Sequence, residues 1–221
     1  MKRFIERISN KLGYELRRRP TENKSFVEIL RNTDFESYFN LTEGSISFKE
    51  ALLLYDLARQ VINNCIVEVG SYRGRSTVAL GRGSIDGGHA PVFAFEPHEE
   101  FTGILGGKFG PSDRGAFYKT MLETSCYHIV RLINLSSEIV APNWNRGISL
   151  LWIDGDHRYE GVKRDFECWH PHLAAKAIIA FHDSTNPELG PKRLIDKLLE
   201  TGNFEKTQQI DKTTVIKINK V

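Results

Sequence analysis

Short apolar runs alternate with amphipathic helical segments from about residue 48 onward, and this alternation is typical of βα units wound around a parallel sheet. The apolar runs predict strands at Cys65–Val69, Val92–Phe95, Ile129–Asn134, Ile148–Ile153 and Ala177–Phe181. The helical patterns between and after them predict helices at Arg75–Arg82, Ala116–Ser125, Tyr159–His170 and Lys192–Thr201. The sequence therefore predicts an α/β fold.

The ends of this pattern carry their own signals. Ser47 followed by Glu50 predicts a capping box at the start of a helix over residues 48–62. "NFEKTQQI" and "TTVIKIN" predict a C-terminal antiparallel hairpin around Asp211–Lys212. The Gly-rich, aperiodic stretch His98–Gly115 is expected to be a mobile lid or a surface loop beside a strand end.

Composition excludes several classes of protein. The 221 residues are 40% hydrophobic and 26% charged, as in an ordinary globular domain. The three cysteines are far apart and form no CxxC pair, so neither a disulfide framework nor a zinc knuckle is expected. No apolar run approaches the roughly 20 residues that cross a bilayer. A cytoplasmic protein is the expectation.

The N-terminal segment is strongly basic. Residues 1–20 hold seven Lys and Arg against two Glu, and Phe4, Ile8 and Leu12 recur at helical spacing. This predicts a basic amphipathic helix within an N-terminal extension over residues 1–45, with a further short helix at residues 25–31. Packing on the body of the protein is the first interpretation, and peripheral contact with an anionic membrane or a partner is the second. No nucleic-acid partner is expected, because no basic patch with interleaved aromatics follows.

The first chemical signal is the turn in "CIVEVGSYRGRSTVALG". A buried strand ends near Glu68, and Gly70 and Gly74 precede a helix. Ligands bind at such turns in doubly wound sheets. The dinucleotide pattern GxGxxG is absent, because Tyr72 stands where its second glycine would be. Glu96 ends the second strand, where its carboxylate can accept hydrogen bonds from a ribose diol. Together these features favour a nucleoside-bearing cofactor.

The second signal lies at two later strand ends. Asp154 ends the fourth expected strand, and His182 and Asp183 end the fifth. If these strands are neighbours, the three side chains converge and can hold a divalent cation. His157 can reach the same pocket as a general base. The competing interpretation is that Asp154 and Asp156 only cap the helix that begins near Arg158.

Four stretches carry a family resemblance: "IVEVGSYRGRSTVALG", "FAFEP", "LLWIDGDHRYEGVKRDFECW" and "AIIAFHDS". They resemble class I S-adenosylmethionine (SAM)-dependent methyltransferases, in particular the metal-dependent O-methyltransferases of methyltransferase family 24 that act on the sugars of macrocin and mycinamicin. The resemblance covers roughly residues 44–185. It implies a Rossmann-like, mostly parallel seven-stranded sheet, with residues 46–221 as the SAM-dependent methyltransferase domain.

The resemblance also implies roles for individual residues. Glu68, Gly70, Ser71 and Gly74 would line the methionine part of the cofactor, with Tyr72 and Ser76 in the same turn. Glu96 would hold the ribose, Ser136 or Ser137 would lie near the adenine, and Ser45 in "EGSIS" would belong to a segment that folds over the cofactor. The other implied site residues are Asp154, His182 and Asp183 as metal ligands, Asp154 also beside the cofactor, His157 as catalytic base and Asp156 as a further catalytic residue.

His182 departs from the family pattern, which often has a carboxylate at this position. An imidazole weakens binding of Mg²⁺ relative to Mn²⁺ or Zn²⁺. Either the metal differs from the Mg²⁺ expected in the family, or Asp156 completes the ligand set, or the site works without metal.

These features predict a SAM-dependent O-methyltransferase that acts on a hydroxyl of a sugar or glycosylated small molecule, with phenolic acceptors as another option. A homo-oligomer is compatible with the sequence. Two alternatives are a nicotinamide-dependent reductase, which requires the missing glycine pattern, and a non-catalytic module that binds SAM or docks on membranes.

Overall fold

A seven-stranded sheet forms the centre of the part of the chain that the computed structural model describes, residues 35–219. Its strand order is β5-β2-β1-β6-β7-β9-β8. The strands are β1 (Cys65–Val69), β2 (Val92–Phe95), β5 (Val130–Ile133), β6 (Ile148–Ile153), β7 (Leu173–Phe181), β8 (Phe204–Ile210) and β9 (Thr213–Ile218). The first five run parallel, whereas β9 is antiparallel to both β7 and β8. The predicted doubly wound, Rossmann-like sheet with a C-terminal hairpin is confirmed.

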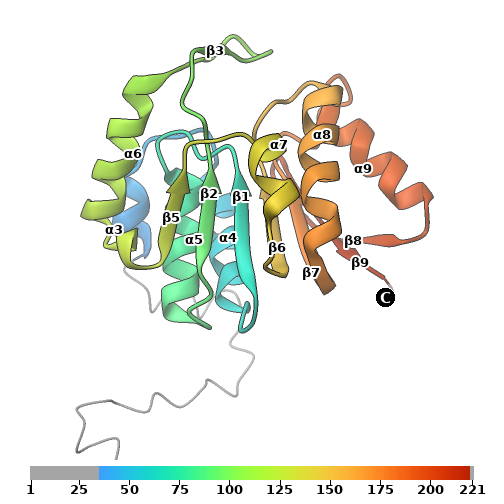
Figure 1. Cartoon of the computed structure of the whole chain (residues 1–221), viewed down its shortest axis with the longest axis horizontal. Helices are drawn as coiled ribbons and strands as arrows, with labels where there is room; N and C mark the ends of the chain where they lie inside the picture. Colours follow the sequence, from blue (N-terminus) through green and yellow to red (C-terminus); the bar gives the residue numbers. More distant parts are fainter. Residues whose placement is uncertain (1–34, 220–221) are drawn as a thin grey trace, which may run out of the picture. The chain divides into compact units, whose positions relative to one another are not determined.

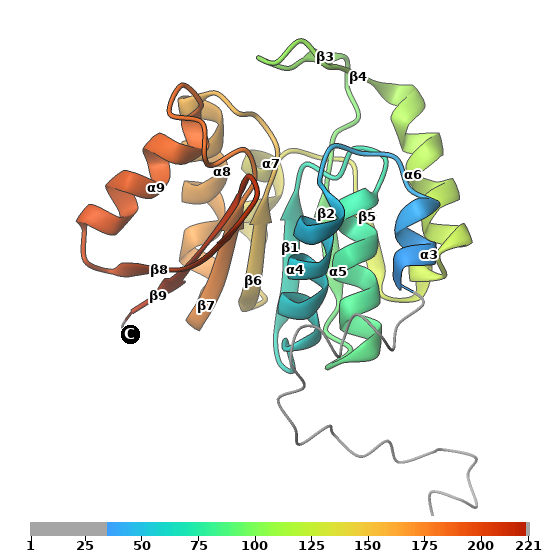
Figure 2. The same cartoon turned by 180° about the vertical axis from the view of Figure 1, so that it is seen from behind.

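Helices cover both faces of this sheet. They are α3 (Phe35–Asn40), α4 (Phe48–Arg59), α5 (Arg75–Asp86), α6 (Pro111–Glu123), α7 (Ser137–Val140), α8 (Tyr159–Trp169) and α9 (Gly190–Glu200). Figures 1 and 2 show α4 and α5 on one face and α7 and α8 on the other. Short 3-10 turns follow at Cys126–His128, Ala141–Asn143 and His170–His172.

The predicted capping box at the start of α4 is present. Ser47 Oγ accepts the backbone N–H of Glu50, and Glu50 Oε2 accepts the backbone N–H of Ser47. The basic helix expected within residues 1–20 and the short helix expected at residues 25–31 lie outside the described residues. The compact unit to which the sheet belongs begins at Phe35. None of the helices described in residues 35–219 has the length and apolar character needed to cross a membrane.

The segment His98–Gly115 differs from the expected irregular loop. It contains a small antiparallel hairpin, β3 (Phe101–Thr102) with β4 (Lys108–Phe109), and α6 begins at Pro111, five residues before the predicted start. Proline is favoured in the first helical turn, where its missing N–H costs nothing. Only a few α6 side chains are buried, Phe117 and Met121 among them, so its apolar periodicity is too weak to show where the helix begins. The hairpin stands above the sheet at the top of Figure 1.

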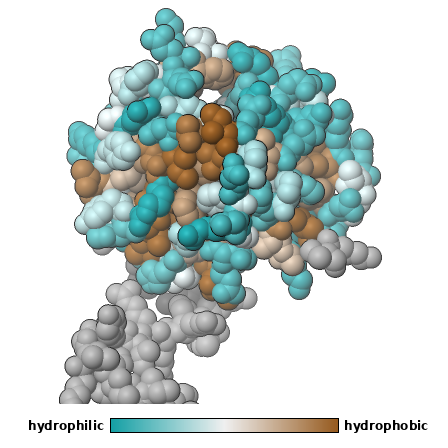
Figure 3. Space-filling view, in the orientation of Figure 1, coloured by the Kyte–Doolittle hydropathy of each residue, from teal (hydrophilic) through white to brown (hydrophobic). Residues whose placement is uncertain are grey.

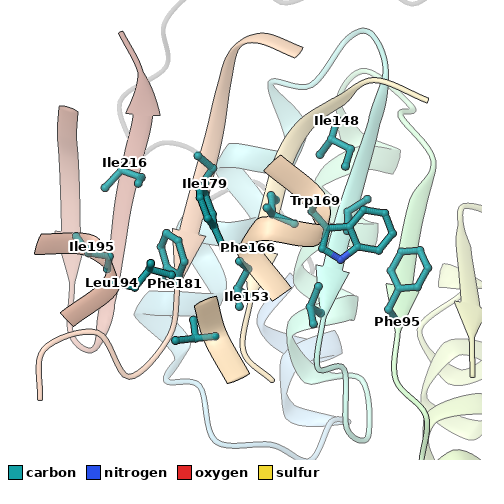
Figure 4. Packing of buried hydrophobic residues seen from close by; sticks show 14 of the residues in the cluster. Phe95, Ile148, Ile153, Phe166, Trp169, Ile179, Phe181, Leu194, Ile195 and Ile216 are labelled. Atoms are coloured by element: carbon teal, nitrogen blue, oxygen red, sulfur yellow. The ribbon is translucent and has the colours of Figure 1, made fainter. Parts of the chain in front are cut away.

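The main apolar core lies between the sheet and helices α8 and α9. Figure 4 shows Trp169 beside Phe95, and Phe166 beside Phe181. Trp169 is fully buried, its ring 4.5 Å from that of Phe95, centroid to centroid. Burying side chains of this size contributes a large share of the stability of a domain. The core holds β6 and β7 rigidly side by side, and the candidate site lies at their carboxyl ends.

The tryptophans of the described residues pack in or against the core. Trp152 is fully buried, and Trp144 packs edge-on against both Phe93 and Trp169. Some apolar surface nevertheless remains outside: it gathers near the middle of the face shown in Figure 3. Leu135, after β5, and Ile139, on α7, are among the exposed apolar residues. Leu135 also lines the candidate site.

Candidate active site

A cavity of about 830 Å³ opens at the carboxyl ends of the parallel strands. This is the edge at which open α/β sheets bind their ligands. The chain segments around the cavity are those that the sequence singled out. Its lining includes Ser45, Gly70, Ser71, Tyr72, Ser76, Glu96, Ser136, Ser137, Asp154, Asp156, His157 and Asp183.

The turn between β1 and α5 forms one wall. Gly70 has φ +85°, and a Cβ added there would lie 2.3 Å from the backbone oxygen of Asp154, so the turn and the end of β6 touch through backbone atoms. Tyr72 also has a positive φ, +45°. Its N–H donates to Glu96 Oε2 (3.2 Å), and its carbonyl lies 2.9 Å from His98 Nε2. Glu96 and His98 therefore hold the shape of the turn.

Two residues expected to line the methionine part of the cofactor, Glu68 and Gly74, lie behind the cavity wall. Glu68 is fully buried and accepts hydrogen bonds from Ser76 Oγ (2.5 Å) and Thr77 Oγ1 (2.6 Å). Burial raises the pKa of Glu68 to about 8, although these two hydrogen bonds act to lower it. Gly74 is the N-cap of α5 and packs against Met121 and Phe117. Both residues shape the turn from beneath.

Buried hydroxyls face the cavity. Ser71 Oγ is buried and has no hydrogen-bond partner within the described residues, although Ser71 lines the cavity. An unpaired buried hydroxyl is unfavourable, so a ligand that pairs with it is expected to bind here. Ser137 Oγ accepts the indole N–H of Trp169 (3.0 Å), and Ser136 is the N-cap of α7.

The segment over residues 43–46 covers part of the cavity, as expected for "EGSIS". Arg75 fixes its position: Nη1 donates to the carbonyl of Gly44 (2.6 Å) and Nη2 to that of Thr42 (2.6 Å). The guanidinium also lies over the ring of Phe39, 4.6 Å from its centroid. Ser45 therefore lines the cavity from a tethered segment.

Acidic and imidazole groups that follow β6 and β7 meet beside the turn between β1 and α5. The two strands pair in parallel up to Ile153 and Phe181, so the residues that follow lie side by side. Asp154 Oδ1 is 2.9 Å from His182 Nδ1 and 3.1 Å from His157 Nε2. Asp183 Oδ2 is 3.6 Å from His182 Nδ1 and 3.7 Å from His157 Nε2. Within the described residues, Asp154, His157 and His182 form a group whose ligand atoms lie within 4.8 Å of one another.

His182 is fully buried and lies between two carboxylates. Its Nε2 faces Glu50 Oε1 at 3.5 Å, on the other side from Asp154. Burial by itself lowers the pKa of His182, but the charge and hydrogen bond of Asp154, with Glu50 behind, raise it above its usual range. The same imidazoles hold the pKa of Asp154 below its ordinary value despite burial. The site is therefore built around ionised carboxylates.

Asp156 has a different environment from Asp154. Its Oδ1 accepts the backbone N–H of Arg158 (3.0 Å), and its Oδ2 lies 3.4 Å from Arg158 Nη1. A Cβ on Gly161 would meet the Asp156 carboxyl at 2.5 Å, so this group covers the first turn of α8. The capping interpretation is wrong for both residues: among the described residues α8 has no side-chain cap, Asp156 binds the N–H of the residue before the helix, and Asp154 is committed to the cluster.

Sequence reasoning missed four residues around the site. Glu50 was read only as part of a capping box, and His98 only as the start of a loop. Lys212 Nζ lies 3.3 Å from Asp183 Oδ1, although it belongs to the turn between β8 and β9. Asp165 on α8 lines the cavity, and burial raises its pKa to about 6 against a hydrogen bond from Ser137. The sequence did contain a sign of this: Asp165 lies on the apolar face of the predicted helix, where an acidic residue is unusual.

The sheet with its antiparallel strand β9 thus carries one cavity lined by the Gly70–Tyr72 turn and by acidic and imidazole groups. Residues 67–184, more than half of the chain, match Methyltransf_24, the methyltransferase domain family 24. The chain belongs to this family. The match decides against the nicotinamide-dependent reductase that the sheet alone would permit.

Solved structures share the fold at low sequence identity. Rv0187 from MTB, in a cofactor-bound crystal structure, is 14% identical, with a TM-score of 0.64 over 91% of this chain and 93% of that one. The O-methyltransferase from Bacillus cereus in complex with SAH is 15% identical, with a TM-score of 0.62 over 96% and 95%. The O-methyltransferase TomG from Streptomyces achromogenes, in complex with SAM, is 15% identical, with a TM-score of 0.59 over 89% and 91%.

A curated relative matches over a short stretch. Over 43 residues, 20% of this chain, the sequence is 44% identical to uncharacterized protein y4gI of Sinorhizobium fredii. The match covers 5% of that protein, so it shows only a local similarity.

Proposed function

We propose that the chain is a SAM-dependent O-methyltransferase whose acceptor is a hydroxyl of a sugar or a glycosylated small molecule. The observation that carries the proposal is one cavity with two chemically different walls. The Gly70–Tyr72 turn with Glu96 forms one wall, and Asp154, His157 and Asp183 contribute to the other. A nucleoside-bearing methyl donor fits the first wall, and activation of a hydroxyl fits the second.

The residues around the first wall fit the methyl donor. The unpaired Ser71 hydroxyl can donate a hydrogen bond to its carboxylate, and Glu96 can accept from a ribose diol. Ser136, Ser137 and Ser45 line the same cavity; the two former would lie near the adenine, and Ser45 would cover the donor from the tethered segment. The SAM- and SAH-bound O-methyltransferases with a similar fold support this assignment.

The donor set on the second wall fits a divalent cation. Asp154 and Asp183 line the cavity and would hold it, together with His182 once that buried imidazole has given up its proton; the contacts within the cluster are 2.9 to 3.7 Å long. The one imidazole nitrogen in this set favours Mn²⁺ or Zn²⁺ over Mg²⁺ more than an all-carboxylate set does. Glu50 behind His182 is the kind of partner that orients a ligating imidazole.

His157 is placed to serve as the general base. Its Nε2 faces Asp154 at 3.1 Å, which leaves Nδ1 to accept the proton of the acceptor hydroxyl. Asp154 and Asp183 raise the pKa of His157 against the effect of burial, so the imidazole is a stronger proton acceptor than a free histidine. When bound, SAM supplies an electrophilic methyl group, and a divalent cation lowers the pKa of a coordinated hydroxyl. The tethered 43–46 segment and the buried turn exclude water from the donor.

The test is incubation of the full chain with methyl-labelled SAM and a panel of sugar, glycoside and phenolic acceptors, followed by mass spectrometry. Label on a sugar hydroxyl supports the proposal. Label on phenols alone would show that the acceptor is a phenol and not a sugar. Tight SAM binding without transfer to any acceptor supports a non-catalytic module instead.

A further inference from the structure

The β3–β4 hairpin presents apolar side chains at the mouth of the cavity. Phe101 pairs with Phe109 across the two strands, so their side chains share one face. They are 39% and 37% exposed, and Leu105 at the tip is 61% exposed. Two paired strands of two residues each have no core of their own. Exposed apolar residues gathered at a cavity mouth indicate a binding surface.

The aromatic rings at this mouth form a row. The Tyr72 and Phe109 rings meet edge to face, with centroids 5.2 Å apart, and the Phe109 and Phe101 centroids are 6.1 Å apart. Arg158 ends the row, its guanidinium 5.4 Å from the Phe101 centroid and its Nη2 donating to the carbonyl of Thr102 (3.3 Å). The row thus runs from the cofactor turn to the residue after His157.

The glycines at the hairpin tip leave room for this arrangement. A Cβ on Gly103 or Gly107 would lie 3.3 or 3.1 Å from the Phe109 ring. Phe101, Leu105 and Phe109 line the same cavity as Asp154 and His157. A molecule that binds to this row of rings therefore lies in the same cavity as the proposed base. A small molecule fits such a cavity better than a folded protein partner does.

We propose that the acceptor carries an aromatic or acyl group close to its reacting hydroxyl, and that Phe101, Leu105 and Phe109 bind this group. The identity of the occupant as the acceptor rests on the proposed function. Leu105 offers no hydrogen bond, so an unsubstituted sugar placed against it would lose the hydration of its hydroxyls without compensation. An aryl or acyl substituent covers the same side chain favourably. The polar part of the acceptor then faces His157 and Asp154.

Binding of a fluorescent apolar probe tests the surface without turnover. The full chain, saturated with SAH, is titrated with 1-anilinonaphthalene-8-sulfonate. Phe101→Ala and Phe109→Ala are each expected to weaken binding by roughly tenfold. Leu105→Asp keeps both strands of the hairpin unchanged and is expected to weaken binding as well, which covers the case in which a phenylalanine variant loses the hairpin. Tyr118→Ala is the control, because Tyr118 is an exposed aromatic on α6 that does not line the cavity. Equal affinity in all five proteins overturns the proposal.

Matched acceptors separate this proposal from the proposed function. The phenyl and methyl glycosides of one sugar differ only in the apolar group, and the phenyl glycoside is expected to have a KM lower by roughly tenfold in the wild-type protein and not in Leu105→Asp. Equal KM values for the two glycosides in the wild-type protein overturn the inference. Absence of methyl transfer to any acceptor, with probe binding still dependent on Phe101 and Phe109, contradicts the proposed function and leaves the apolar site standing.

Discussion

The Glu50 carboxylate and the His182 imidazole face each other at 3.5 Å in the interior, although 132 residues of sequence separate them. Glu50 belongs to the first turn of α4, and Oε1 also accepts the N–H of Lys212 (3.0 Å) and the hydroxyl of Thr213 (2.9 Å). One side chain thus joins a helix start, the β8–β9 turn and the cluster. Because Glu50 takes the Nε2 side of the ring, Nδ1 is directed to Asp154.

Glu50→Gln is expected to weaken binding of Mn²⁺ by about 10- to 100-fold, because an outer-shell carboxylate fixes the orientation and basicity of a ligating histidine. Isothermal titration of the full chain with Mn²⁺ measures this directly. Ser47→Ala is the control for the start of α4: it removes the serine side chain of the capping box but leaves the Glu50–His182 contact in place, whereas glutamine at residue 50 can keep the box. Equal losses in the two variants would show that Glu50 acts only through the fold of α4.

His157→Ala is expected to lower kcat by about 10²- to 10⁴-fold while the affinity for SAM stays nearly unchanged. Mn²⁺ affinity is expected to persist as well, because the proposed ligands are Asp154, His182 and Asp183. Turnover and two binding titrations check the variant against His128→Ala, which removes an exposed histidine elsewhere. Unchanged methylation removes His157 as the base, and a lost metal affinity makes it a ligand.

Chelation is expected to abolish methyl transfer, and added Mn²⁺ or Mg²⁺ is expected to restore it. The reason is that the cluster offers carboxylate and imidazole donors suited to a divalent cation. Initial rates after dialysis against a chelator, with and without each metal, provide the measurement. Full activity after exhaustive chelation would show that the reaction needs no metal.

Glu68→Gln is expected to stabilise the fold at pH 8 relative to the wild type. The pKa of Glu68 rises from 4.5 to about 8 on folding, so the folded state holds this proton more tightly than the unfolded state does. The resulting stability is complete below pH 4.5 and declines as the pH rises toward 8. Glutamine stays neutral, so the gain at pH 8 is on the order of 4 kcal/mol. Urea unfolding at pH 5 and pH 8 tests this against Glu200→Gln, which changes an exposed residue of α9. A parallel pH dependence in all three proteins would contradict it.

Gly70→Ala is expected to lower the free energy of unfolding by more than about 2 kcal/mol, since φ is positive and the new methyl group meets a backbone carbonyl. Gly115→Ala is the matched change in open space on α6, where nothing lies within 4 Å of the added Cβ. That variant is expected to be more stable by about 0.8–1 kcal/mol. Denaturation midpoints and SAM affinity of both variants provide the measurement. A stable Gly70→Ala protein that still binds SAM would refute the close approach of the two backbones.

The sheet was predictable because its strands are buried on both faces and therefore read as short apolar runs. Cys65–Val69 and Ile148–Ile153 agree with the structure at both ends. The β3–β4 hairpin was not predictable, because two-residue strands such as Phe101–Thr102 have no periodicity to detect. Helix ends at Pro111 and Gly190 were missed for a related reason: their first turns carry few core residues.

The cluster was predictable because parallel strands end at one edge, so Asp154 and His182–Asp183 had to meet once β6 and β7 were neighbours. The burial of Glu68 was not predictable. An acidic residue at the end of a strand has the same neighbours in sequence whether its side chain faces a ligand or, as here, Ser76. Glu50 escaped notice because its capping role already explained it. Contacts between residues so distant in sequence follow from the packing of whole elements.

The residues that support the proposed catalytic centre lie beyond both ends of the segment that matches the family, because Glu50 precedes residue 67 and Lys212 follows residue 184. A fragment trimmed to that segment would keep the four residues of the cluster. It would lose Glu50, which contacts His182, and Lys212, which contacts Asp183. A comparison of family members over the matched segment alone would therefore leave out Glu50 and Lys212, the two residues that support the cluster from outside it.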